Sequence, residues 1–150
     1  MPDRMKIHYV KPGRPEVIKT DIAKDTRYGL YIVQSESRPD FFRIGATGIH
    51  DKGTMRGRLF TTYQRKPSEK NWTTRNLKWK ILWVAEIQAG TQFSTVAAEY
   101  VIFSHFVRLF SFVDYSGFCS TPEVASMIVD EVRSLEAELE KVIAFQINKE

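Results

Sequence analysis

The sequence contains one cysteine, Cys119, and only three histidines in 150 residues. A lone cysteine excludes an internal disulfide and a zinc site built from several cysteines, and the histidines lie too far apart to show metal-ligand spacing. No stretch approaches the roughly 20 apolar residues that a membrane span requires, and residues 1–6 lack the apolar segment of a secretory signal. We therefore expect an intracellular protein with no membrane partner.

The charged residues are divided unevenly along the chain. Residues 1–80 hold 18 lysines and arginines against 8 acids, whereas residues 81–150 hold 4 against 10. The segment 51–80 alone has 9 basic and 2 acidic residues. A basic half of this kind favours a polyanion such as DNA as a partner, although a solvated basic surface would give the same counts. The candidate nucleic-acid-binding residues are Lys52, Arg56, Arg65, Lys66, Lys70 and Arg75.

Hydrophobic periodicity predicts three strands and three helices. The strands are expected at 28–33, 41–45 and 77–87, and the helices at 55–66, 94–111 and 121–146. Residues 1–26, with Pro12, Gly13 and Pro15, are expected to form an irregular N-terminal arm. Residues 27–150 then form one α+β domain with a small, mostly antiparallel three-stranded sheet flanked by helices, in the order β-β-α-β-α-α.

The last predicted helix has a continuous apolar stripe, which is expected to pack on its own domain. Its length also permits a homodimer through this helix. The stripe consists of Val124, Ile128, Val132, Leu135, Leu139 and Val142.

Glu99 is the most informative single residue. On a helical wheel that advances about 100° per residue, it falls among Phe103, Phe106 and Phe110 and away from the polar side of the predicted helix. A buried carboxylate must be neutral, paired with a cation or bound to a metal ion. An internal ion pair with an arginine and a functional role both satisfy this requirement.

Two short motifs resemble a known family. Gly29-Leu30-Tyr31 is followed, after eleven residues, by Arg43-Ile44-Gly45. This pair resembles the signature of the GIY-YIG nucleases, in which each triplet lies on one strand of a hairpin. An arginine-bearing helix, a further strand and a helix with a single glutamate follow in the family's order. The resemblance covers about residues 27–112.

The resemblance implies hydrolysis of DNA phosphodiester bonds with one divalent metal ion, Mg²⁺ or Mn²⁺. Tyr31 would be the general base or would position the attacking water, Arg58 would neutralise charge on the phosphate, and Glu99 would hold the metal. Arg43 would contact phosphate or lower the pKa of Tyr31. Tyr63 is an auxiliary candidate.

Two other functions are compatible with the same residues. A catalytically inactive module could keep the scaffold and bind nucleic acid without cutting it. Alternatively, the chain could be a protein-interaction module that uses its C-terminal helix, in which case its affinity for nucleic acid would depend little on salt.

Overall fold

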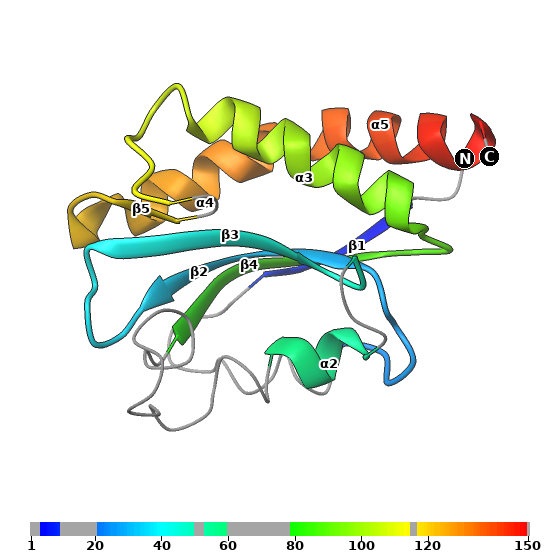
Figure 1. The fold of residues 1–150 in the computed structure, drawn as a ribbon, viewed down its shortest axis with the longest axis horizontal. Coiled ribbons are helices and arrows are strands. Elements are labelled where there is room, and N and C mark those ends of the chain that lie inside the picture. Colours follow the sequence, from blue (N-terminus) through cyan, green and yellow to red (C-terminus); the bar gives the residue numbers. More distant parts are fainter. Residues whose placement is uncertain (1–3, 10–20, 50–52, 60–78, 115–116, 150) are drawn as a thin grey trace.

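A five-stranded antiparallel sheet with helices on both faces forms the centre of the computed structural model (Figure 1), which describes residues 4–9, 21–49, 53–59, 79–114 and 117–149. The strands are β1 (Met5–Tyr9), β2 (Gly29–Ser35), β3 (Phe41–Thr47), β4 (Trp79–Ile87) and β5 (Gly117–Cys119). Their order across the sheet is β1-β4-β2-β3-β5. The predicted α+β class and antiparallel sheet are confirmed, but the sheet has two more strands than the sequence predicts.

Both additional strands lie at the edges of the sheet. β1 pairs with β4, so residues 5–9 of the arm predicted to be irregular belong to the sheet of the main domain. β5 has three residues and pairs with Phe41, Phe42 and Arg43 of β3, and its Phe118 also bridges to Phe112. Neither strand has a strong local pattern, because a short edge strand is defined mainly by its non-local pairing.

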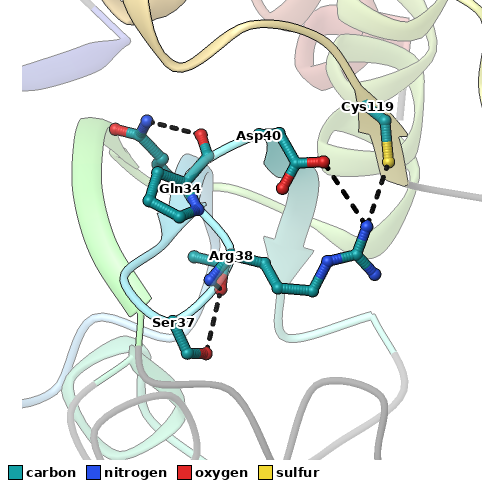
Figure 2. Close-up of polar contacts among 7 residues, drawn as sticks. Gln34, Ser37, Arg38, Asp40 and Cys119 are labelled. Atoms are coloured by element: carbon teal, nitrogen blue, oxygen red, sulfur yellow. Dashed lines mark hydrogen bonds and ion pairs between the residues drawn. The ribbon is translucent and has the colours of Figure 1, made fainter.

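The β2–β3 hairpin is closed by side chains as well as by backbone pairing. Gln34 donates from Nε2 to the Pro39 carbonyl at 2.8 Å, and the guanidinium of Arg38 reaches Asp40 at 3.5 Å and the Cys119 sulfur at 3.9 Å (Figure 2). Arg38 therefore links the hairpin turn to β5, the strand that pairs with the first residues of β3.

Three helices cover one face of the sheet, namely α3 (Gln92–Phe106), α4 (Ala125–Ser134) and α5 (Glu136–Lys149), with a 3₁₀ turn, η2 (Pro122–Val124), before α4. Instead of one helix over 121–146, the chain forms η2, α4 and α5, with a break at Leu135. Most of the predicted apolar stripe is buried within the domain, and Ile143 is buried where Val142 was expected. The apolar stripe that was considered for a homodimer contact is therefore largely buried in the core of its own domain.

The orientation of α3 differs from the prediction. Thr91 begins the helix, since its side chain accepts from the Ser94 amide and Ser94 Oγ accepts from the Thr91 amide. The residues of α3 that are buried against the sheet and α5 are Ser94, Thr95, Ala98, Ile102 and Phe106. Five apolar residues that recur at helical spacing would predict a different buried face: of these, Val96, Tyr100 and Val107 are exposed, and Phe103 and Phe110 are only partly buried. Small residues allow the helix to approach the sheet closely, which hydrophobicity alone does not indicate.

The other face of the sheet is covered by α2 (Met55–Gly57). Met55 and Leu59 are buried in one cluster with Tyr31 and Val33, in agreement with their separation of one helical turn within the predicted helix 55–66. The remainder of the predicted helix, up to residue 66, lies outside the described residues. None of the helices in the described part of the chain is long and apolar enough to cross a bilayer.

Candidate active site at the open edge of β3

Tyr31 lies on the α2 face of the sheet, and its ring lies over Gly45 of the neighbouring strand β3. The two residues are register partners. A Cβ atom on residue 45 would lie 2.3 Å from both Cζ and Oη of Tyr31. The missing side chain of Gly45 therefore makes room for the phenol, and the Tyr31 hydroxyl is directed over β3.

Replacing Gly45 with alanine is expected to destabilise the fold by about 1–3 kcal/mol, because the new methyl group must displace the Tyr31 ring from a packed site. Gly57→Ala is the matched control, since a Cβ there would come no closer than 3.4 Å to another side chain. Urea unfolding of both variants measures the difference. Equal stability of the two variants would show that the phenol does not need the space above Gly45.

Arg43 lies two residues before Gly45 and points to the same face of the sheet as Tyr31. Its Nη2 donates to Oδ2 of Asp114 at 3.0 Å, and its guanidinium lies 5.6 Å from the centre of the Phe41 ring. Asp114 is half-exposed, so this ion pair is close to solvent. Arg43 is thus held by Asp114 at the β5 end of β3.

The two arginines near α2 have different surroundings. Arg58 directly follows the helix and is half-buried next to Leu59, a member of the Tyr31 cluster. Arg56 donates from Nε to the Ile22 carbonyl, so part of its guanidinium has a structural contact. The other predicted basic and auxiliary residues lie outside the described part of the chain: Lys52, Tyr63, Arg65, Lys66, Lys70 and Arg75.

Glu99 is carried by α3 and therefore lies on the opposite side of the sheet from Tyr31. The helical wheel predicted that Glu99 points into the aromatic core. In the structure it is instead half-buried on a flank of α3. Burial of the carboxyl raises its pKa to about 7. The two principal catalytic candidates thus approach β3 from different faces.

The level of Glu99 along β3 follows from contacts at the two ends of α3. At the start of the helix, Gln92 donates to the carbonyl of Ile49, just beyond β3. At its end, Phe106 stacks on Phe118 of β5, the register partner of Phe42. Since α3 runs antiparallel to β3, Glu99 at the midpoint of the helix is aligned with the middle of the strand.

The flank of α3 that bears Glu99 faces the outer edge of β3. Phe103, one turn after Glu99, contacts Phe112, and Phe112 contacts Phe118 of β5. Among the described strands only β5 lies beyond β3, and it pairs with residues 41–43. Glu99 therefore faces the edge of β3 that has no neighbouring strand in the described chain, while the Tyr31 hydroxyl lies over the same strand on the other face of the sheet and is buried.

The edge supplies few protein ligands for a metal ion. No group of three or more His, Cys, Asp or Glu side chains suited to a metal occurs among the residues that the structure describes. Mg²⁺ commonly keeps several waters and is held by one or two carboxylates together with substrate phosphates. As a single half-buried carboxylate, Glu99 would suit only an ion of this kind.

A second carboxylate, Glu86 of β4, is not among the functional residues predicted from the sequence. It is 1% exposed and accepts from Thr26 Oγ1 at 2.7 Å and from the Ala23 amide at 3.0 Å, while its Oε2 lies 2.7 Å from Nε2 of His8. Burial favours the neutral form, but the hydrogen bonds from Thr26, His8 and Ala23 prevail and lower the pKa of Glu86 below its ordinary value.

Glu86 connects three parts of the chain beside the candidate site. His8 belongs to β1, Ala23 and Thr26 precede β2, and Glu86 itself pairs with Gly29. In the sequence, Glu86 stands out only as an acid within the apolar run of β4. Its hydrogen-bond partners Thr26 and His8 lie 60 and 78 positions away in the chain. The cluster holds the segment that leads into the Tyr31 strand.

Comparisons with known proteins add no further information about the site. The chain matches no protein-family model, no curated protein and no solved structure. The chemistry of the β3 edge is therefore inferred from its own residues.

Proposed function

We propose that the protein is a divalent-metal-dependent DNA endonuclease of the GIY-YIG type, which hydrolyses phosphodiester bonds at the open edge of β3. The observation that supports this best is that Gly45 leaves room for the Tyr31 phenol over β3, while contacts at both ends of α3 align Glu99 with the middle of the same strand. A half-buried acid at such a place is costly for folding alone, so a functional role accounts for it better than packing does.

Each residue has a distinct role in this proposal. Glu99 holds the metal ion, which would polarise the phosphoryl oxygen and stabilise the leaving oxygen. Tyr31 positions the attacking water and, in its phenolate form, would accept the water's proton to become the phenol; Gly45 leaves room for the ring. Arg58 and Arg43 neutralise charge that develops on the phosphate.

The distribution of charge supports a nucleic acid as the substrate. The chain holds ten more basic than acidic residues in 1–80 (18 against 8). The α2 side of the sheet, where Tyr31 lies, is covered by an element from this basic half. Contacts between basic side chains and phosphates would give binding that weakens steeply as salt is raised.

Plasmid cleavage tests the proposal. The protein is expected to nick or linearise DNA with Mg²⁺ or Mn²⁺ and to be inactive with EDTA. Tyr31→Phe should slow cleavage by about 10²–10⁴-fold, the usual contribution of a general base, whereas Tyr28→Phe serves as a control outside the site. Salt-sensitive binding without cleavage would instead indicate an inactive nucleic-acid-binding module, and the absence of both would favour a protein-interaction module.

A further inference from the structure

The outer face of α3 carries an apolar seam exposed to solvent. Phe93 is 69% exposed, Val96 43%, Tyr100 70% and Val107 59%. Together with the half-buried Phe103, they recur at intervals of three and four residues, which is the spacing of a helix–helix contact. We call these five residues the α3 seam.

The surroundings of the α3 seam also differ from an ordinary solvated helix face. The helix from Gln92 to Phe106 contains no lysine or arginine, and Glu99 is its only acid. A shallow groove of about 410 Å³ runs along the seam, lined by Tyr100, Phe103, Ser104, Val107 and Phe112. Exposed helix faces of monomers are usually charged or polar, and contiguous apolar patches mark sites of association.

We propose that the α3 seam is the contact surface for a second copy of this chain, whose own α3 packs antiparallel to the first. A two-fold axis beside Tyr100 places the two Tyr100 side chains next to each other. The same register sets Phe93 of one copy opposite Val107 of the other, and Val96 opposite Ser104. Apart from the Tyr100 pair at the axis, each larger side chain therefore faces a smaller one, so the surface can pair with itself.

Charge and area both suit a second copy. The absence of lysine and arginine from α3 means that two copies meet without repulsion between basic side chains. Aromatic side chains cover about 150–250 Å² each, so the paired seams would bury on the order of 1,000 Å², near the lower limit for specific interfaces. A weak dimer is expected, with a dissociation constant of about 10–100 µM. This inference does not depend on the proposed nuclease activity.

Sedimentation velocity of the full chain tests the dimer over concentrations that span this range. The wild-type protein is expected to change from monomer to dimer, and Tyr100→Glu should remain monomeric throughout. Phe145→Glu is the matched control, because Phe145 is 64% exposed on α5 and the same charge is introduced outside the seam. A monomeric wild type, or a dimer lost in Phe145→Glu but kept in Tyr100→Glu, would overturn the proposal.

Cross-linking tests the antiparallel register. In a Cys119→Ser background, Tyr100→Cys should give a covalent dimer with a short bismaleimide, because the two positions meet at the axis. Phe93→Cys alone should not cross-link, whereas a mixture of Phe93→Cys and Val107→Cys chains should. Efficient cross-linking of Phe93→Cys alone would contradict the antiparallel arrangement.

Discussion

Glu99→Gln is expected to lower the rate of metal-dependent DNA cleavage by about 10²–10³-fold, since the amide cannot supply the negative charge that holds the metal ion. Single-turnover cleavage at saturating enzyme measures the rate of the chemical step. Asp130→Asn, which alters an exposed acid on α4, should keep the wild-type rate. A Glu99→Gln protein that cleaves as fast as the wild type would contradict the role assigned to Glu99.

The same substitution should stabilise the protein. Because burial raises the folded-state pKa of Glu99 from 4.5 to about 7, the folded state binds more protons than the unfolded state between these values. Wild-type stability should therefore fall as the pH rises from about 4.5 to 7 and level off above it. Glu99→Gln removes the cost of ionising the buried carboxyl. We expect a gain in unfolding free energy of about 1–2 kcal/mol, a value that already allows for the partial exposure of Glu99. Loss of cleavage together with a raised Tm above pH 7 is typical of a functional residue rather than a structural one.

Cleavage by the wild type should also depend on pH. A carboxyl with a pKa of about 7 is a good metal ligand only when it is deprotonated. The rate at limiting Mg²⁺ is therefore expected to rise between about pH 6 and 8, and less steeply at saturating Mg²⁺, because the bound metal favours the ionised form.

Glu86→Ala is expected to have the largest effect on stability, a loss of about 3–5 kcal/mol, which is a large part of the total for most domains. The change leaves His8, Thr26 and the Ala23 amide without the buried carboxylate that binds them. Urea unfolding monitored by circular dichroism measures the loss. Glu140→Ala is the matched control: Glu140 also anchors β1, by accepting from the amides of Arg4 and Met5, but it is only half-buried.

The control should lose about 1 kcal/mol, as expected for more exposed hydrogen bonds. Because the pKa of Glu86 is lowered in the folded state, its contribution is present above its unfolded pKa and is lost as the pH falls through the folded value. The difference between wild type and Glu86→Ala should therefore shrink in acid. A difference that is unchanged below pH 4.5 would show that the carboxylate is not held in its ionised form.

The elements that the sequence predicts well are those with strong local patterns. The β2–β3 hairpin has two runs of aromatic and β-branched residues on either side of a proline turn, and Met55 and Leu59 lie one helical turn apart. β1 and β5 were missed because their pairing partners are distant in the chain. The break at Leu135 has no glycine or proline to mark it.

The candidate site was predicted only in part. The helical wheel placed Glu99 away from the polar side of the helix. It also predicted that the large apolar residues of α3 are buried, whereas the buried residues include Ala98 and Ile102. Consequently Glu99 lies at the edge of β3 instead of among the phenylalanines. Glu86 could not be assigned, because its environment depends on His8 and Thr26, which only the folded sheet brings to it.

Binding of Mn²⁺ followed by NMR tests most directly whether Glu99 holds a metal ion at the edge of β3. With a short, uncleavable DNA present, paramagnetic broadening is expected to be strongest at the amides of residues 44–47 on the open edge of β3. Glu99→Gln should abolish that broadening while the remaining spectrum stays that of the folded protein. Broadening centred elsewhere, or unchanged in Glu99→Gln, would contradict a metal site at this edge.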